Sequence, residues 1–251
     1  MTAYALLLEY DGRGFVGWQT QPNGLSVQQV LEEAASKLAG GAPVAAAIAG
    51  RTDAGVHAIG QVAMITLERD LPPQRLREAL NFHMKPHAVV VQEARLAPEG
   101  WHPRFDAKRR RYRYIILNRS ARPALEMGHV WHMPHPLEAG AMAEGARFLL
   151  GRHDFTSFRA SSCQAKSPLR TLDRLDVRRD GYHVIIEAEA RSFLHHQVRN
   201  MVGTLKLVGE GAWAPARMAE ALAACDRAAA GPTAPPDGLT FISVDYEPPV
   251  F

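Results

Sequence analysis

The sequence predicts an α+β protein made of two halves, each of which alternates strands and helices. Apolar residues form short runs typical of strands and recur with helical spacing in longer segments, and Gly- and Pro-rich turns separate the two kinds. With 251 residues the chain is long enough for one large domain or two closely packed halves. No internal repeat is evident, so the similarity of the halves lies in their order of elements.

The first half is predicted to run strand, helix, strand, helix, strand. Ser26 followed by Gln29 is typical of a capping box, which predicts a helix start at this point. Pro72 and Pro73 are expected to begin the second helix. The elements in order are a strand over 3–10, a helix over 26–40, a strand over 61–67, a helix over 72–80 and a strand over 89–91.

The second half repeats this rhythm after a boundary placed between residues 107 and 108, which gives halves of 1–107 and 108–251. Asp180 and Gly181 between two apolar runs indicate a β-hairpin. The small polar residues of 160–167 predict a mobile loop. The elements are a strand over 108–118, a helix over 137–150, the hairpin, a helix over 193–208, a helix over 215–224 and a strand over 239–246.

The basic side chains are concentrated in one segment. The formal net charge is only +3, but residues 104–113 hold five arginines and one lysine against a single acid, Asp106. Arginine grips phosphate through two parallel hydrogen bonds, so such a density favours a nucleic acid partner. The alternative is a solvated edge strand that its charges protect from aggregation.

The two cysteines, Cys163 and Cys225, have no partner motif for a disulfide framework or a structural zinc site, which favours a reducing, cytoplasmic environment. Cys163 lacks an assignable base and is interpreted as a spare thiol. The first apolar run is stopped by Glu9 and Asp11, too early for a signal sequence, and no apolar stretch approaches membrane-spanning length. We therefore expect no membrane association.

The best candidate for chemistry is Asp53, in a segment that reads Gly-Arg-Thr-Asp-Ala-Gly-Val-His from Gly50 to His57. It is expected in a loop between strands, where catalytic groups concentrate. Gly50, Ala54 and Gly55 leave room for a substrate to approach the carboxylate. A plain β-turn in which Asp53 bonds its own backbone is the alternative.

Other chemistries lack their motifs. The sequence has no phosphate-binding loop, no dinucleotide fingerprint and no serine nucleophile elbow. His195 and His196, placed on the predicted helix, would point about 100° apart and would not chelate one ion. What remains is a carboxylate, arginines and tyrosines, which suit covalent or glycosyl chemistry on RNA.

Four blocks, in the same order, resemble the tRNA pseudouridine synthase A family. They are Gly50–His57, the Arg-Arg-Tyr-Arg-Tyr of 110–114, the Asp-Phe-Thr-Ser-Phe of 154–158, and the Phe-Leu-His-His-Gln-Val-Arg-Asn of 193–200. The resemblance covers nearly the whole chain. It implies an isomerase that cleaves the uridine glycosidic bond, turns the base and rejoins it through C5, with no metal and no organic cofactor.

The resemblance assigns roles to individual residues. Asp53 matches the catalytic aspartate, as nucleophile or base, and Tyr112 matches the tyrosine that packs on the target base. Arg199 matches the basic residue that pairs with the aspartate. Arg51 matches the residue that fills the stack when the base flips. Two segments match regions that contact tRNA: Trp101, His102, Pro103, Arg104 and Phe105, and the more variable Ser162, Cys163, Gln164, Ala165 and Lys166.

The implied fold is a pseudouridine synthase fold, with a mixed, mostly antiparallel sheet and a basic cleft between two pseudo-symmetric halves that form one catalytic unit. The implied substrate is uridine at positions 38–40 of the tRNA anticodon stem-loop, and the implied assembly is a homodimer. Two rival hypotheses remain: a tRNA-binding module that has lost catalysis, and a metal-dependent RNA hydrolase that uses the histidines.

Overall fold

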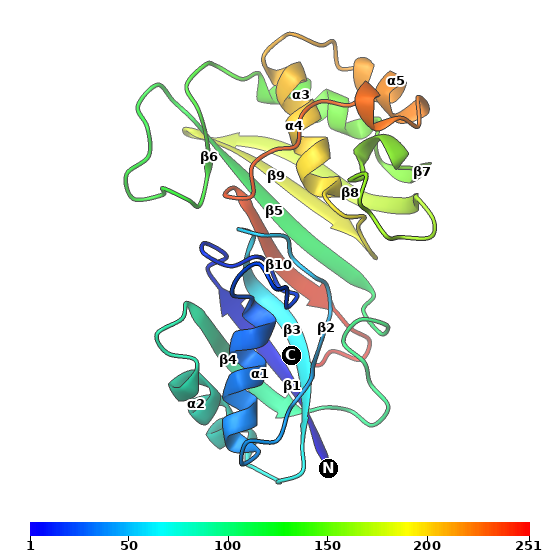
Figure 1. The fold of residues 1–251 in the computed structure, drawn as a ribbon. Coiled ribbons are helices and arrows are strands. Elements are labelled where there is room, and N and C mark those ends of the chain that lie inside the picture. Colours follow the sequence, from blue (N-terminus) through cyan, green and yellow to red (C-terminus); the bar gives the residue numbers. More distant parts are fainter. The chain divides into compact units, whose positions relative to one another are not determined.

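The computed structural model describes residues 1–251, which divide into two compact units. Unit 1 comprises 1–110 and 240–251, and unit 2 comprises 111–239. The chain leaves unit 1 in β5 (Arg109–Asn118) and returns in β10 (Leu239–Asp245), so both termini belong to unit 1 (Figure 1). The division at residues 107 and 108 stays a prediction; it assigned 240–251 to the second half, whereas these residues pack in unit 1.

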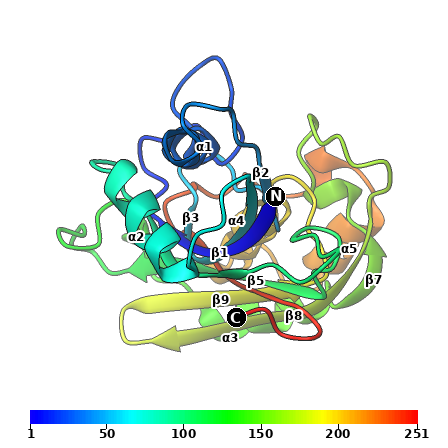
Figure 2. The same cartoon turned by 90° about the horizontal axis from the view of Figure 1, so that it is seen from below.

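The strands of unit 1 run in the order β4, β1, β3, β10, with β2 also on β3. β1 is antiparallel to both β3 and β4, and β10 is parallel to β3. The helices α1 and α2 contact one another, and Figure 2 shows α1 above β1. The bounds are β1 (Thr2–Tyr10), α1 (Val27–Leu38), β2 (Ala46–Ile48), β3 (His57–Leu67), α2 (Pro73–His83) and β4 (Val89–Leu96).

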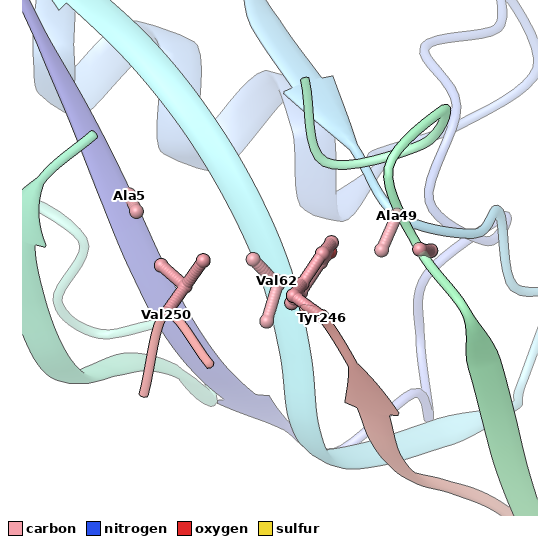
Figure 3. Close-up of a cluster of buried hydrophobic side chains, with 6 residues drawn as sticks. Ala5, Ala49, Val62, Tyr246 and Val250 are labelled. Atoms are coloured by element: carbon pink, nitrogen blue, oxygen red, sulfur yellow. The ribbon is translucent and has the colours of Figure 1, made fainter. Parts of the chain in front are cut away.

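β1 is buried on both faces, which explains its run of apolar residues. Leu6 and Leu8, on one face, are fully buried. Ala5, on the other, joins a cluster with Val62, Tyr246 and other residues (Figure 3). The C-terminal segment therefore covers the sheet face opposite Leu6 and Leu8, and this cluster is where residues 240–251 become part of unit 1.

The strands of unit 2 run in the order β5, β9, β8, β7, with β6 parallel to β5. β8 and β9 form the hairpin expected at Asp180–Gly181, and Asp180 pairs with His183 across the turn. The helix α3 contacts β8, α4 and α5. The bounds are β6 (Trp131–Met133), α3 (Ala139–Arg147), β7 (Gly151–Asp154), β8 (Leu169–Asp180), β9 (His183–Ala190), α4 (Gln197–Gly209) and α5 (Arg217–Ala223).

The helix α4 begins at Gln197, four residues later than predicted, because the chain takes a left-handed conformation at His196, where φ is +62°. Two short 3₁₀ turns, η1 (Thr156–Phe158) and η2 (Arg227–Ala229), lie in segments predicted to be irregular or at a helix end. The predicted α+β class and mostly antiparallel strand pairing are confirmed. The pseudo-symmetry of the halves and the basic cleft stay predictions. No helix is both long and apolar enough to cross a membrane.

The cap of α1 gives a test of the local sequence argument. Ser26 Oγ accepts a hydrogen bond from the Gln29 backbone N–H at 3.1 Å, but the Gln29 side chain bonds Glu33 instead of closing the capping box. Ser26→Ala should lower the free energy of unfolding by about 1 kcal/mol, whereas Gln29→Ala should change it by less than about 0.5 kcal/mol. Urea denaturation of both variants measures this difference, and equal losses would contradict a one-sided cap.

Candidate active site

Asp53 lies in the loop between β2 and β3, as predicted, and its side chain is half-buried. The Asp53 carbonyl accepts a hydrogen bond from the Val56 N–H at 3.1 Å, which closes a β-turn. Gly55 has a φ of +77° within this turn, a conformation that favours glycine. The β-turn that the sequence allowed at Asp53 is therefore present, and it gives the Asp53 carboxylate a defined backbone position.

Buried side chains complete the hydrogen bonds of the backbone that enters this loop. Arg110 donates to the Ala49 carbonyl from Nε at 3.0 Å and from Nη2 at 2.6 Å. Gln61, fully buried on β3, donates to the Gly50 carbonyl at 2.7 Å. Because unpaired buried carbonyls are costly, these contacts hold the loop in one position.

Tyr10 holds the same loop from β1. Its hydroxyl lies 2.8 Å from Thr52 Oγ1, and both side chains are buried. Burial raises the pKa of Tyr10 to about 12, although the hydrogen bonds from Thr52 and Gln61 oppose this rise. The phenol therefore stays protonated at neutral pH and serves as a fixed hydrogen-bonding group next to Thr52.

Two glycines of the segment after β1 pack against the Asp53 loop. A Cβ on Gly12 would lie 2.2 Å from the Val56 carbonyl oxygen, and a Cβ on Gly17 would lie 2.7 Å from that of Thr52. The Trp18 N–H donates to the Thr52 carbonyl at 3.0 Å. The close approach requires glycine at both positions, so the segment after β1 packs directly against the backbone of the Asp53 loop.

Asp11 places a carboxylate in the segment that packs against the Asp53 loop. Burial raises the pKa of its carboxyl, but hydrogen bonds from Arg13 and the nearby His57 ring outweigh burial, and the pKa falls to about 2. Asp11 Oδ1 lies 3.1 Å from Nδ1 of His57, which is buried at the start of β3. The Gly12 N–H also points at His57 Nδ1, at 3.1 Å. Asp11 and Gly12 thus both contact His57, the last residue of the Gly50–His57 segment.

The predicted RNA-contacting segment 101–105 is also fixed in unit 1. The Trp101 ring packs 5.1 Å from the Tyr246 ring, and the Tyr246 hydroxyl donates to the Pro103 carbonyl at 2.8 Å. Arg110 Nη2 donates to the Arg104 carbonyl at 2.9 Å. The side chain of Phe105 is nevertheless 69% exposed. The backbone is held while a ring remains available to a ligand.

The basic segment 104–113 divides into different roles. Arg110 is 7% exposed and binds two backbone carbonyls, so the interpretation of this whole run as a basic surface was wrong at Arg110. Arg111 donates to Glu189 at 3.1 Å, whereas Lys108 and Arg109 are exposed. Alternation along β5 explains the difference between Arg109 and Arg110, because successive side chains point to opposite faces of a strand.

Tyr112 and Arg199 lie in unit 2. The Tyr112 ring is half-buried and stands perpendicular to the Phe193 ring at 5.2 Å. Arg199 lies in the first turn of α4, and its Nε donates to the Ala234 carbonyl at 2.8 Å. Burial raises the pKa of the neighbouring Tyr114, with Arg199 opposing the rise and Asp237 adding to it.

The structure corrects the argument about the paired histidines. His195 and His196 precede α4, and their ring centroids are 4.0 Å apart, so the helical spacing used against shared chelation does not apply. The His195 carbonyl accepts from the Ala160 N–H at 2.9 Å, which joins this segment to the loop of 160–167. Ser162, Gln164 and Lys166 of that loop are exposed. The absence of a metal stays a prediction.

The predicted site residues thus belong to both units. Asp53, Arg51 and 101–105 lie in unit 1, whereas Tyr112, Arg199 and 162–166 lie in unit 2. Sequence reasoning missed Gly12, Gly17 and Gln61; the first two appear in the sequence only as loop glycines, and Gln61 as a polar residue at a strand start. The convergence of Asp53, Tyr112 and Arg199 stays a prediction.

The Asp11 carboxylate gives a prediction for pH dependence. Its pKa in the folded state, about 2, is below the ordinary value of 3.8, so ionised Asp11 stabilises the fold above about pH 4. That stabilisation is lost as the pH falls toward 2. The difference in unfolding free energy between the wild type and Asp11→Asn should shrink by about 1–2 kcal/mol between pH 5 and pH 2, allowing for solvent screening.

Urea denaturation across this pH range measures the difference. Asp176→Asn is the matched control, because Asp176 is an exposed partner of Arg174, and surface ion pairs contribute little. A constant difference for Asp11→Asn over the whole range would contradict the proposed ion-pair stabilisation.

Comparison with known proteins places these features in a family. A family model described as tRNA pseudouridine synthase matches residues 7–106 and 146–247. The chain is 72% identical over 248 residues to a tRNA pseudouridine synthase A of Acidiphilium cryptum, covering 98% of this chain and 97% of that protein. It is 59% identical over 246 residues to that of Paramagnetospirillum magneticum, covering 98% and 96%.

A third relative, the tRNA pseudouridine synthase A of Gluconobacter oxydans, is 52% identical over 249 residues, covering 98% of this chain and 90% of that protein. The matched regions contain the Asp53 loop in unit 1 and Arg199 in unit 2. Residues 107–145, which include Tyr112, lie outside the match to the family model. The identities span both units and nearly their full length. The chain therefore belongs to the tRNA pseudouridine synthase family.

Proposed function

We propose that this protein converts uridine to pseudouridine in tRNA and that Asp53 carries the reaction. The observation that carries this assignment is the Asp53 loop, in which Arg110, Gln61 and Trp18 hold three backbone carbonyls and Tyr10 holds the Thr52 side chain. A carboxylate fixed in this way can be placed within reaction distance of one atom of a substrate. The family membership supplies the substrate class.

The reaction is an isomerisation, so atoms and electrons balance without a co-reactant. The bond between C1′ and N1 breaks, the base turns, a bond between C1′ and C5 forms, and the C5 proton is exchanged for one on N1. Asp53 has two possible roles in this sequence: to attack C1′ and hold the sugar covalently, or to remove a proton. In both roles the carboxylate must be ionised and must reach the sugar.

Arg51 and the unit 2 residues complete the proposal. Arg51 is exposed, two residues before Asp53, so its guanidinium plane can occupy the space that the flipped base leaves in the stack. We propose that Tyr112 packs on the extruded base. Arg199 pairs with the Asp53 carboxylate in the substrate complex and keeps it charged. These roles require the two units to meet at the substrate.

The finer assignments follow the family resemblance. The proposed substrate region is the anticodon stem-loop, and a homodimer would double the basic surface that a long tRNA needs. Exposed Lys108, Arg109 and Lys166 are the candidates for phosphate contacts. Both cysteines are free thiols, in line with the cytoplasmic location expected for a tRNA-modifying enzyme.

The Asp53 carboxylate can be tested by a substitution that removes only its charge. Asp53→Asn keeps the size of the side chain and removes its charge, so the single-turnover rate of pseudouridine formation should fall at least about 1,000-fold, while the Kd for tRNA should change less than about 3-fold. Carbodiimide mapping of unmodified tRNA measures the product, and filter binding measures the Kd. Asp70→Asn, a carboxylate in the same unit that accepts a bond from Tyr4, is the control.

Full activity of Asp53→Asn would remove Asp53 from the chemistry. A wild type that binds tRNA tightly but forms no pseudouridine would identify a binding module instead. Cleaved tRNA products, or activity lost with a chelator, would point to a metal-dependent hydrolase.

A substitution at Arg110 separates loop support from RNA contact. Arg110→Lys keeps the charge but loses the fork that binds Ala49 and Arg104, so the rate at saturating tRNA should fall about 10- to 100-fold through misplacement of the Asp53 loop. The Kd and its salt dependence should stay within error of the wild type. The exposed neighbour Arg109 is the control, because Arg109→Gln should weaken binding and reduce the salt slope by about 1. A reduced salt slope in Arg110→Lys would instead make Arg110 a phosphate contact.

A further inference from the structure

Arg227 lies outside every sequence motif, yet its guanidinium binds the loop next to Arg199. Nη1 donates to the Gly231 carbonyl at 2.9 Å. Nη2 donates to Asn200 Oδ1 at 3.2 Å and to Thr233 Oγ1 at 3.1 Å. One half-buried side chain thus joins both ends of the segment 231–233 to α4. A planar fork suits such bridging, because its donors have fixed directions.

Asn200 is the residue of α4 that receives this connection. It is fully buried, and its Oδ1 accepts a second hydrogen bond from the Thr233 hydroxyl at 2.7 Å. Its Nδ2 donates to the Phe158 carbonyl at 2.9 Å. The side chain therefore connects the Asp154–Phe158 motif and the 231–233 segment through one position, directly after Arg199 in sequence.

The backbone of 231–233 lies directly on α4. A Cβ on Gly203 would lie 1.8 Å from the Pro232 carbonyl oxygen, and the Gly231 N–H donates to Thr204 Oγ1 at 2.9 Å. This close approach is possible because residue 203 has no side chain. The segment has no strand partner, so side-chain hydrogen bonds set its position.

The next residue, Ala234, contacts Arg199 twice. The Ala234 carbonyl accepts from Arg199 Nε at 2.8 Å, and the Ala234 N–H donates to the Arg199 carbonyl at 3.1 Å. The position of the Ala234 carbonyl therefore helps to set the direction of the Arg199 guanidinium. Arg227, together with Asn200 and Thr204, holds that loop against α4.

We propose that Arg227 is a positioning residue: it fixes the 231–234 loop and, through the Ala234 carbonyl, orients Arg199. This inference rests on the proposed function only in giving Arg199 a role at the substrate. Its structural content is that Arg199 loses its fixed hydrogen bond when Arg227 is removed. Arg227 itself does not contact tRNA in this proposal.

The direct test observes Arg199 by NMR. Arg199→Lys assigns the Nε–H resonance of Arg199, and the exchange of that proton with water is then compared in the wild type, Arg227→Gln and Arg227→Lys. We expect exchange to accelerate at least about 10-fold in Arg227→Gln, because the bond to Ala234 opens more often. Arg227→Lys keeps the positive charge but has one donor nitrogen in place of the guanidinium fork, so it should accelerate the exchange less than Arg227→Gln does. If Arg227→Gln unfolds, Arg227→Lys still allows the comparison with the wild type.

The functional test uses the same variants with tRNA. The rate of pseudouridine formation at saturating tRNA should fall about 10-fold in Arg227→Gln, while the Kd and its salt slope stay unchanged. Arg217→Gln on α5 is the matched control, because Arg217 is an exposed arginine that pairs with Glu220. Thermal melts establish that each variant is folded at the assay temperature.

The outcomes are distinct. Unchanged Arg199 exchange in a folded Arg227 variant would overturn the proposal, and so would a smaller salt slope with an unchanged rate, which would make Arg227 a phosphate contact. Faster exchange without loss of rate would support the positioning of Arg199 by Arg227 and would remove Arg199 from the proposed mechanism.

Discussion

The backbone carbonyls of Ala49 and Gly50 set the main constraint on the candidate site. They lie at the end of β2, where Gly50 has left the sheet, and they need hydrogen-bond donors. Arg110 and Gln61 supply those donors, and both side chains are buried. A change at either position would leave a carbonyl unpaired and would release the loop that carries Asp53. The need to pair two peptide groups therefore fixes the position of a catalytic candidate.

Unit 2 uses the same physical device. The 231–234 segment is irregular, and Arg227, Asn200 and Thr204 hold it against α4. In each unit an arginine that would be assigned to nucleic acid from its charge binds backbone carbonyls of the protein instead. An arginine count therefore overestimates the surface available to phosphate.

Much of the fold could be predicted from the sequence, because periodicity is a local property. The run of β1, the Ser26 cap and the Asp180–Gly181 hairpin were all placed correctly. The short strands β6 and β7 were missed, since three or four residues carry no reliable period and exist through pairing with distant partners. The start of α4 was placed too early, because apolar spacing continues through Leu194 while the backbone turns left-handed at His196.

The candidate site was only partly predictable for a related reason. Resemblance to a family selects residues by type and order, and it assigned roles to Asp53 and Arg199 that stay predictions. It does not reveal which side chains hold those residues in place. Gly12 and Gly17 act through the absence of a Cβ, and Arg227 acts through a loop that follows it. These roles depend on distances between segments remote in sequence, which no local pattern encodes.

Within residues 51–53, the Asp53 loop combines a fixed backbone at Thr52 with an exposed side chain at Arg51. Thr52 is buried and bonded on its side chain by Tyr10 and on its backbone by Trp18, whereas Arg51 is exposed. Under the proposed function this arrangement has a physical reason. A carboxylate that acts on one atom loses rate when displaced by about 1 Å, whereas a side chain that fills an emptied stack must enter after the base has left. In that proposal the fixed backbone at Thr52 serves the chemistry of Asp53, and the exposed side chain of Arg51 serves the extrusion of the base.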